Sequence, residues 1–266
     1  MDVKSVKLVY FSPTGTSRKI AEAVARGAGA PFEHVDLTRP EARTSEFEEF
    51  GPELAVISMP VWAGRVPAEA VTRLRRLKAD DTPAVLTVVY GNRAYEDALL
   101  ELSDLALEAG FRPVAGGAFI GEHSYSTSEK PTAHGRPDSS DLKKAEEFGS
   151  RVKEKLADIG DPQDIPSMEF PGNHPYRDGN WDPGERMDPT TEEELCIKCG
   201  RYAEACPTAA ITVEDVVSTE EEACIWCCAC VKSCPTDARV MRPYTYKLTE
   251  WLHTNHSSWK EPETYL

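Results

Sequence analysis

Eight cysteines are confined to one short stretch of this 266-residue chain, and their spacing is suited to metal chemistry. All eight lie within residues 196–234, and the first 195 residues contain none. The second part of the stretch reads Cys224-x-x-Cys227-x-x-Cys230-x-x-x-Cys234-Pro235. Soft thiolate sulfur suits iron, and a spacing of two residues lets successive side chains converge on one iron–sulfur cubane.

The first part of the stretch repeats this pattern with one change. It reads Cys196-x-x-Cys199-x-x-Tyr202-x-x-x-Cys206-Pro207, so a tyrosine stands where the third cysteine is expected. Residues 196–212 and 224–240 therefore form an internal repeat. The intact run resembles that of bacterial two-cluster ferredoxins, in which the fourth cysteine binds the other cluster.

This resemblance implies one complete [4Fe–4S] site. Its ligands would be Cys224, Cys227, Cys230 and Cys206. Zinc is the competing interpretation, since C-x-x-C pairs also occur in zinc sites. A zinc ion needs only four ligands, and it leaves both Cys-Pro ends and the third cysteine of the second run unexplained. The pattern therefore favours iron–sulfur.

The other site would be held by Cys196, Cys199 and Cys234, with Tyr202 in the fourth position. Three outcomes are open: a [3Fe–4S] cluster, a [4Fe–4S] cluster with solvent, the phenolate or another residue as fourth ligand, or an empty site. We expect an occupied site, because three of the four ligands are intact. Cys228 is a spare thiol, but its neighbour belongs to the first site, which disfavours it as the missing ligand.

A second candidate site lies near the start of the chain, in the loop 12–17. This loop reads Ser-Pro-Thr-Gly-Thr-Ser between an apolar run and a helix-like segment. Its hydroxyls, together with the N–H groups that open a helix, could hold a phosphate. Neither the Walker pattern nor G-x-G-x-x-G is present. The alternative interpretation is an ordinary capped helix start.

Two later loops favour a flat cofactor. Residues 60–67 read Pro-Val-Trp-Ala-Gly-Arg-Val-Pro, and residues 90–95 read Tyr-Gly-Asn-Arg-Ala-Tyr. Each follows an apolar strand-like run and combines aromatic residues with a glycine, so a planar ring could stack there.

These loops need a scaffold that brings them together. Strands are expected at 6–11, 32–37, 54–59, 84–90 and 114–120, and helices at 16–28, 68–78, 94–109 and 139–159. Alternating strands and helices of this length predict an α/β fold with a doubly wound, five-stranded parallel sheet in the order 2-1-3-4-5. The carboxyl ends of its strands then lie at one edge.

The three loops resemble the flavin-contacting loops of flavodoxins. The domain order resembles a fusion of an N-terminal flavodoxin with a C-terminal two-cluster ferredoxin, over about residues 4–240. The resemblance implies FMN, with Trp62 flanking its ring, Gly64 and Gly91 near its edge, and Tyr95 as a second stacking residue. Residues 121–125, which include His123, would close the site. The implied phosphate contacts are Ser12, Thr14, Gly15, Thr16 and Ser17, and the implied ring contacts are Pro60, Val61, Trp62, Ala63, Gly64, Tyr90, Gly91, Asn92 and Tyr95.

Composition changes divide the chain into four parts. Residues 1–159 are expected to form the flavodoxin-like domain and residues 160–194 a Pro-, Gly- and Asp-rich linker. Residues 195–240 would form a small α+β ferredoxin-like domain. The tail 241–266 is rich in aromatic residues, which predicts docking onto the body.

The charge balance and hydropathy limit the classes of partner. A formal charge of −15 argues against nucleic acid. The chain shows neither a membrane-spanning run nor a secretion signal, so we expect a cytoplasmic protein. The acidic surface suits a redox partner with a basic face, although solubility alone would also explain it. Oligomerisation is left open.

An electron carrier that passes electrons between FMN, clusters and a partner protein fits this pattern. A flavin-dependent reductase of a small molecule is the alternative, but the sequence shows no acid–base pair for it. A protein that has lost its cofactors is the third hypothesis, motivated only by Tyr202.

Overall fold

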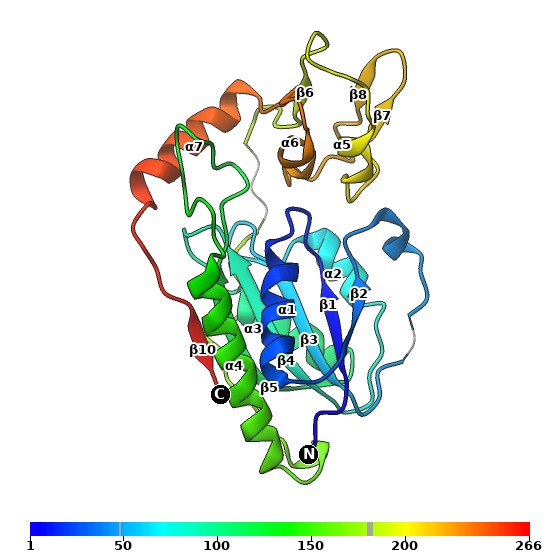
Figure 1. Cartoon of the computed structure of the whole chain (residues 1–266), viewed down its shortest axis with the longest axis vertical. Helices are drawn as coiled ribbons and strands as arrows, with labels where there is room; N and C mark the ends of the chain where they lie inside the picture. Colours follow the sequence, from blue (N-terminus) through cyan, green and yellow to red (C-terminus); the bar gives the residue numbers. More distant parts are fainter. Residues whose placement is uncertain (48, 180–182) are drawn as a thin grey trace.

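The computed structural model describes residues 1–47, 49–179 and 183–266, and a central six-stranded sheet organises them (Figure 1). The strand order is β10-β5-β4-β3-β1-β2. Five strands are parallel: β1 (Val6–Tyr10), β2 (Phe32–Asp36), β3 (Leu54–Pro60), β4 (Thr82–Tyr90) and β5 (Phe111–Ile120). The predicted flavodoxin-like order 2-1-3-4-5 is confirmed. A short sixth strand, β10 (Glu263–Tyr265), adds to β5 in the antiparallel direction and was not predicted.

Helices cover both faces of the sheet. On one face lie α1 (Thr16–Ala28) and α4 (Ser139–Ala157), and on the other α2 (Ala68–Leu74) and α3 (Ala98–Glu108). α1 and α4 pack with their backbones close together, because a Cβ on Gly27 or Gly149 would collide with the backbone of Glu146 or Val24. Asp138 caps α4 and forms a capping box with Asp141, which fixes the predicted start of that helix.

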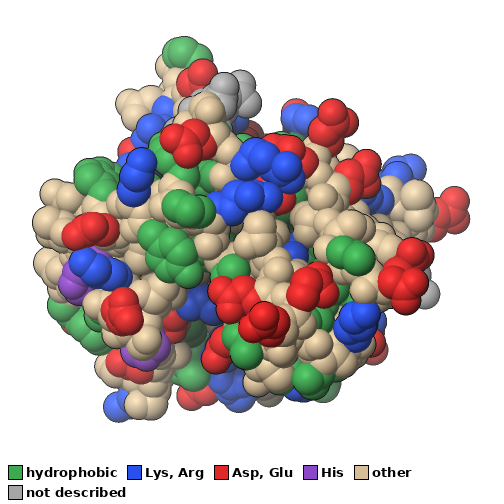
Figure 2. All heavy atoms as spheres, turned by 90° about the horizontal axis from the view of Figure 1, so that it is seen from above, with side chains coloured by type: hydrophobic (Ala, Val, Ile, Leu, Met, Phe, Trp, Pro, Cys, Tyr) green, Lys and Arg blue, Asp and Glu red, His purple; other side chains and the backbone are tan. Residues whose placement is uncertain are grey.

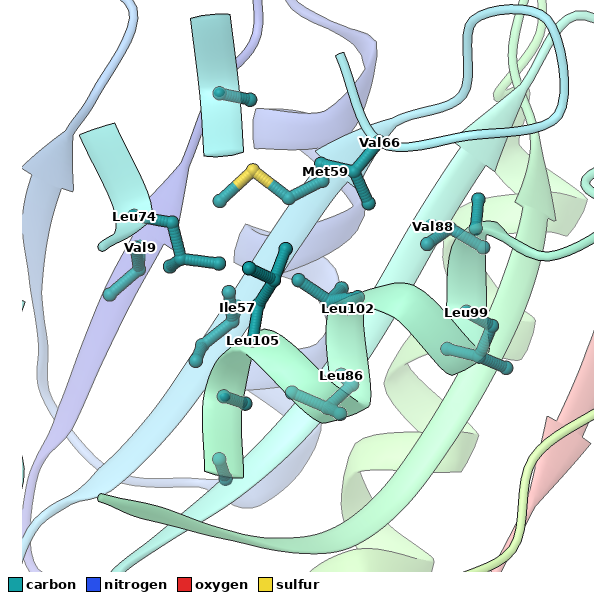
Figure 3. Close-up of a cluster of buried hydrophobic side chains, with 14 of the residues drawn as sticks. Val9, Ile57, Met59, Val66, Leu74, Leu86, Val88, Leu99, Leu102 and Leu105 are labelled. Carbon is teal, nitrogen blue, oxygen red and sulfur yellow. The ribbon is translucent and has the colours of Figure 1, made fainter. Parts of the chain in front are cut away.

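Aliphatic side chains fill the space between the sheet and the α2–α3 layer (Figure 3). The strands contribute Val9, Ile57 and Leu86, which meet Leu74 of α2 and Leu102 of α3. β3 and β4 are buried along almost their whole length, as expected for strands covered on both faces. This packing fixes the strand ends from which the candidate loops emerge.

The cysteine module lies beyond the carboxyl ends of the parallel strands (Figure 1). Its elements are β6 (Thr190–Thr191), α5 (Arg201–Glu204), β7 (Ile211–Val213), β8 (Val217–Thr219), α6 (Ala229–Ser233) and β9 (Arg239–Val240). β6 pairs with β9 and β7 with β8, both antiparallel. We call residues 190–240 the cysteine module from here on.

The tail after the module returns to the body. α7 (Pro243–Asn255) lies beside the module, and the chain then runs along α4 to β10 (Figure 1). The segment predicted as a linker, 160–194, contains a short helical turn, η2 (Pro162–Asp164), and Phe170 of this segment is buried against Gly116. Residues 180–182 of that segment lie outside the described residues. A further helical turn, η1 (Pro40–Arg43), follows β2. Within the described residues, no helix has the length and apolar character needed to cross a bilayer.

Candidate functional site

One large cavity, of about 1290 Å³, lies where the carboxyl ends of the parallel strands face the cysteine module. The loops that follow β1, β3, β4 and β5 line it from the body. Residues 224–227 and one side of α7 line it from the opposite direction. The structure therefore brings the three predicted flavin loops together and places half of the intact cysteine run against the same space.

The first loop offers an anion site at the start of α1. Gly15 adopts φ 83°, a left-handed conformation that only glycine takes at little cost, and no side chain caps the helix from this position. Ser12 Oγ accepts a hydrogen bond from the backbone N–H of Arg18 at 3.0 Å. One hydroxyl of the loop therefore binds the first turn of the helix, as the interpretation of an ordinary capped helix start predicts. Ser17 is fully buried, lines the cavity, and its Oγ has no hydrogen-bond partner among the described residues. An unpartnered buried hydroxyl is costly, and a ligand oxygen would relieve it.

The second loop is a tight turn that presents Trp62. Trp62 and Arg65 exchange two backbone hydrogen bonds of 3.0 Å, and Ala63 and Gly64 between them have φ values of 50° and 82°. Positive φ at both central residues defines a type I′ turn, which explains the glycine. A Cβ on Gly64 would also collide with the carboxylate of Glu96. Trp62 is partly exposed, lines the cavity and packs edge-to-face on Phe11.

Some residues of the third loop line the cavity, and others bind the C-terminal tail. Tyr90 and Gly91 line the cavity, and burial raises the pKa of Tyr90 to about 12. Asn92 donates to the carbonyls of His256 and Ser258 at 2.6 and 2.8 Å. The Tyr95 hydroxyl lies 2.8 Å from both Glu263 Oε2 and the Tyr265 hydroxyl. Neither Asn92 nor Tyr95 lines the cavity, so their predicted contacts with a flavin stay predictions. Gly15, one of the predicted phosphate contacts, does not line the cavity either. All other residues predicted to contact FMN line the cavity.

A fourth loop, after β5, completes the wall with His123 and Tyr125. The His123 ring occupies the space that a Cβ on Gly91 would need, and its Nδ1 accepts from the N–H of Tyr125 at 3.1 Å. Burial, assisted by the charges of Lys232 and Arg93, lowers the pKa of His123 to about 4. The ring is therefore neutral at pH 7. The Tyr125 hydroxyl donates to the carbonyl of Trp226 at 3.2 Å, within the 224–227 segment.

The four thiols predicted for the complete site lie together. Cys206, Cys224, Cys227 and Cys230 all line one small cavity inside the module. Burial raises the pKa of Cys224 to about 11, and burial also raises that of Cys227 and Cys230. Four thiols facing one space, three of them buried and Cys224 partly buried, need a cation or a cationic cluster before they ionise.

The sulfur atoms at the ends of both runs sit among donors. The Ala210 N–H donates to Cys206 Sγ at 3.3 Å, and Thr208 Oγ1 lies 3.6 Å from it. Burial raises the pKa of the Cys234 thiol, but N–H groups of residues 236–239 outweigh this and lower it. Donors aimed at sulfur stabilise thiolate, the form that binds metal. Among the described residues, no group of three or more His, Cys, Asp or Glu side chains lies close enough to hold a single metal ion.

Tyr202 points into the second site. It is 1% exposed, and its hydroxyl lies 3.0 Å from Cys196 Sγ. Burial, together with the hydrogen bond to Cys196, raises the pKa of the Tyr202 hydroxyl well above its usual value. Cys199 is exposed and Cys196 partly so, which places this site nearer to solvent than the first. Cys228 is buried away from it and lines the cavity of the first site instead.

The sequence did not predict a role for two arginines that lie near the cysteines. Arg73 of α2 is fully buried and donates to the carbonyls of residues 37–39 and, at 2.6 Å, to that of Pro207 beside Cys206. Arg239 is 2% exposed and lines the small cavity of the four thiols. The ion pair of Arg73 with Glu69, one helical turn earlier, is an ordinary surface pattern, and the carbonyls that Arg73 binds lie far away in sequence, so no local pattern marks its role. Arg239 could have been noticed in the sequence, because the matching position of the first half of the repeat holds an apolar residue, Ile211, instead of a cation.

Comparisons with known proteins add likenesses of fold. No protein-family model matches the sequence, and no curated protein matches it. A flavodoxin from the domain Archaea is 13% identical with a TM-score of 0.37, over 57% of this chain and 99% of that one. A Fusobacterium nucleatum flavodoxin bound to flavin mononucleotide is also 13% identical, with a TM-score of 0.37, over 58% and 99%. A flavone reductase is 11% identical with a TM-score of 0.43, over 62% of this chain and 66% of its own. These TM-scores are below 0.5, so the flavodoxin-like assignment of the N-terminal part rests on its strand order and connectivity.

Proposed function

We propose that this protein is a cytoplasmic electron-transfer flavoprotein. It binds FMN at the carboxyl ends of the parallel strands and iron–sulfur clusters in the cysteine module. FMN exchanges electrons singly or in pairs, and the clusters carry them singly to or from a redox partner. The residues of this chain bind these groups, orient them and set their potentials.

The first loop supports the assignment of FMN. Ser17 Oγ lacks a partner, lines the cavity and lies in the first turn of α1, where backbone N–H groups and the helix dipole favour a phosphate. Trp62 and Tyr90 line the cavity beyond that turn and offer aromatic faces for a flat ring. The residues present therefore fit the predicted cofactor.

The thiols support two clusters. Cys206, Cys224, Cys227 and Cys230 would hold a [4Fe–4S] cluster. Cys196, Cys199 and Cys234 would hold a second cluster, [3Fe–4S] or [4Fe–4S], beside Tyr202. Donors aimed at Cys206 and Cys234 fit iron-bound thiolates, which accept hydrogen bonds. The crossing of each fourth cysteine between the sites would place the two clusters near each other.

One observation carries the proposal: the predicted flavin loops and the segment 224–227 line the same cavity. A flavin in that cavity would lie against Cys224 and Cys227, which are ligands of the complete site. Tyr125 spans the two parts through its hydrogen bond to the Trp226 carbonyl. Lys232 of α6 reinforces the junction, pairing with Glu122 at 2.9 Å and donating to the Ser126 carbonyl.

The surface of the module suits a basic partner. On the face seen from above, acidic and basic side chains form separate groups with exposed apolar ones between them (Figure 2). Leu195, Ile197 and Val216 are exposed near the ligands Cys196 and Cys199. An apolar centre with acidic neighbours is a surface that a redox protein with a basic face would recognise.

A reductase of a small molecule is the second candidate, and the size of the cavity favours it. Ligand pockets usually measure about 300–1,000 Å³, and this cavity reaches about 1290 Å³. Aromatic side chains of Tyr244 and Trp251 on α7 line the part next to the module. A flat apolar molecule could share the cavity with the flavin.

Anaerobic purification followed by spectroscopy tests the proposal. We expect flavin absorption bands, a broad iron–sulfur shoulder and close to one FMN per chain. The variant Ser17→Ala should weaken FMN binding while the iron content stays unchanged, whereas Cys227→Ser should lower the iron content. A reconstituted chain that holds neither flavin nor iron would contradict the proposal. Steady reduction of a small molecule without any protein acceptor would favour the reductase.

A further inference from the structure

Two positions at which the halves of the cysteine repeat differ contact each other in the fold. With a spacing of 28 residues, the repeat matches Tyr202 with Cys230 and Ile211 with Arg239. The guanidinium carbon of Arg239 lies 5.9 Å from the centroid of the Tyr202 ring. Both side chains are buried, with 1% of Tyr202 and 2% of Arg239 exposed.

Arg239 is a buried cation whose terminal nitrogens bind neutral groups. Nη1 donates to Thr191 Oγ1 at 2.8 Å, and Nη2 donates to Thr219 Oγ1 at 2.5 Å. Its Nε is buried without a hydrogen-bond partner among the described residues. A buried charge with only neutral partners is costly unless an anion faces it.

The four thiols of the first site would supply that anion, because they become thiolates when they bind iron. Arg239 lines the small cavity together with Cys206, Cys224, Cys227 and Cys230. Its backbone N–H is a hydrogen-bond donor to Cys234 of the second site. Arg239 therefore stands between the ligands of both sites.

Tyr202 contributes a hydrogen bond to the second site. Its hydroxyl lies 3.0 Å from Cys196 Sγ. An iron-bound thiolate can only accept, so the phenol O–H would be the donor. In the repeat, this donor replaces a fourth thiolate and thereby removes one negative charge from the second site.

We propose that Arg239 and Tyr202 raise the reduction potentials of the two clusters, Arg239 as a cation shared between them and Tyr202 as a donor to Cys196. This inference rests on the proposed function. Taking up one electron from the flavin or from a partner adds one negative charge to a cluster and changes no bond and no proton. A buried cation and an O–H donor both stabilise the reduced form.

The test is a redox titration of the intact protein followed by EPR. Arg239→Gln removes the charge but keeps a donor for the threonine hydroxyls. We expect it to lower the equilibrium constant for reduction of the first cluster at least tenfold, which is about 59 mV for one electron. Arg239→Lys should stay near the wild-type potential. The control Arg201→Gln removes the same charge from an exposed position on α5, where solvent screens it, and should shift the potential far less.

Tyr202→Phe supplies an independent arm, because it keeps the buried ring and removes only the hydroxyl. It should lower the potential of the second cluster and leave that of the first nearly unchanged. Unchanged potentials in Tyr202→Phe and Arg239→Gln, at wild-type iron content, would overturn the inference. If Arg239→Gln loses iron, an unchanged potential in Tyr202→Phe would contradict the role of the hydroxyl, and a lowered potential in Arg239→Lys, which keeps the charge, would contradict the role of that charge. A wild-type protein without clusters would instead contradict the proposed function.

Discussion

At the residue scale, the phenol of Tyr202 lies beside Cys196, at the position where the repeat predicts a thiolate. Tyr202→Cys should restore the missing thiolate and yield two ordinary [4Fe–4S] clusters, since the side chain at this position already points at the ligands. Iron analysis and EPR of the anaerobically purified protein check this. A [3Fe–4S] signal in the wild type should disappear in the variant, and the iron content should rise.

Tyr202→Phe is the matched control, because it changes the same residue without adding a ligand and should not gain iron. If Tyr202→Cys keeps the wild-type iron content and EPR spectrum, another ligand already fills the fourth position.

His123 makes stability depend on pH. The fold lowers the pKa of His123 to about 4. Between pH 6.5 and 4, the imidazole is therefore protonated in the unfolded chain and stays neutral in the folded chain. The stabilisation is complete above pH 6.5 and is lost as the pH falls toward 4. At full effect it amounts to at most about 3 kcal/mol, and less to the extent that the ring keeps contact with water.

Denaturant unfolding at pH 7.5 and pH 5 measures this effect by comparing the wild type with His123→Gln. The variant should lose less unfolding free energy between the two pH values, since other acid-sensitive groups contribute equally to both proteins. Parallel losses would show that His123 titrates normally.

Single residues differ in how well the sequence predicts them. The thiols of the complete site follow from their spacing, because that spacing is a local consequence of the ligand geometry. Arg239 stands out only as a mismatch with Ile211, and its contact with Tyr202 depends on the folded repeat. The partners of Asn92 are tail carbonyls about 160 residues away, which no local pattern encodes.

At the scale of elements, α2 fixes the module against the body through Arg73. The guanidinium pairs with Glu69 and donates to four carbonyls, including that of Pro207. Arg73→Met would leave these buried groups unsatisfied, and we expect it to cost about 3–5 kcal/mol of unfolding free energy. The variant should also slow electron transfer between flavin and clusters, because Pro207 directly follows Cys206, a predicted cluster ligand.

Arg75→Met is the control on the same helix. Arg75 is exposed and pairs with exposed Glu108, so its loss should change stability by no more than about 0.5 kcal/mol. Denaturant unfolding and flash-induced electron transfer measure both variants. Equal stability of the two would refute the role of Arg73.

The long elements follow from the sequence, whereas the short ones do not. β3, β4, α1 and α4 have clear periodicity or continuous apolar runs, which local physics determines. α3 begins at Ala98 rather than Ala94, because residues 91–96 hold loop conformations with positive φ at Asn92 and Glu96. β6, β9 and β10 have two or three residues each and exist only through long-range pairing.

At the scale of the whole molecule, the end of the tail holds the third flavin loop in place. Lys260 donates to the Arg93 carbonyl, and Glu263 and Tyr265 hold the Tyr95 hydroxyl. Removing residues 257–266 should weaken FMN binding about tenfold or more, which is roughly 1.4 kcal/mol. The iron content should stay unchanged, because these contacts are with the body.

Removing only Leu266 keeps all of these contacts and serves as the control. Fluorescence titration with FMN and iron analysis give the two readouts. An unchanged FMN affinity in the longer truncation would show that the loop holds its shape without the tail.

The overall plan was predictable in outline. Alternating strands and helices fix the sheet order, and the cysteine spacing marks the module. The junction between them was not predictable, because it depends on single contacts such as the bond from Tyr125 to the Trp226 carbonyl.

β10 has a consequence for how the molecule is assembled. It pairs with residues 116–118 of β5 at the outer edge of the sheet, and it follows the whole cysteine module in the sequence. Domains generally fold as units and in order of synthesis, so the five parallel strands form while β5 is still an open edge. Until the module has folded and α7 has turned back, that edge can pair with other chains. Under the proposed function, in which clusters hold the module together, iron supply would limit aggregation during synthesis, because a module that fails to fold leaves the edge at β5 unprotected.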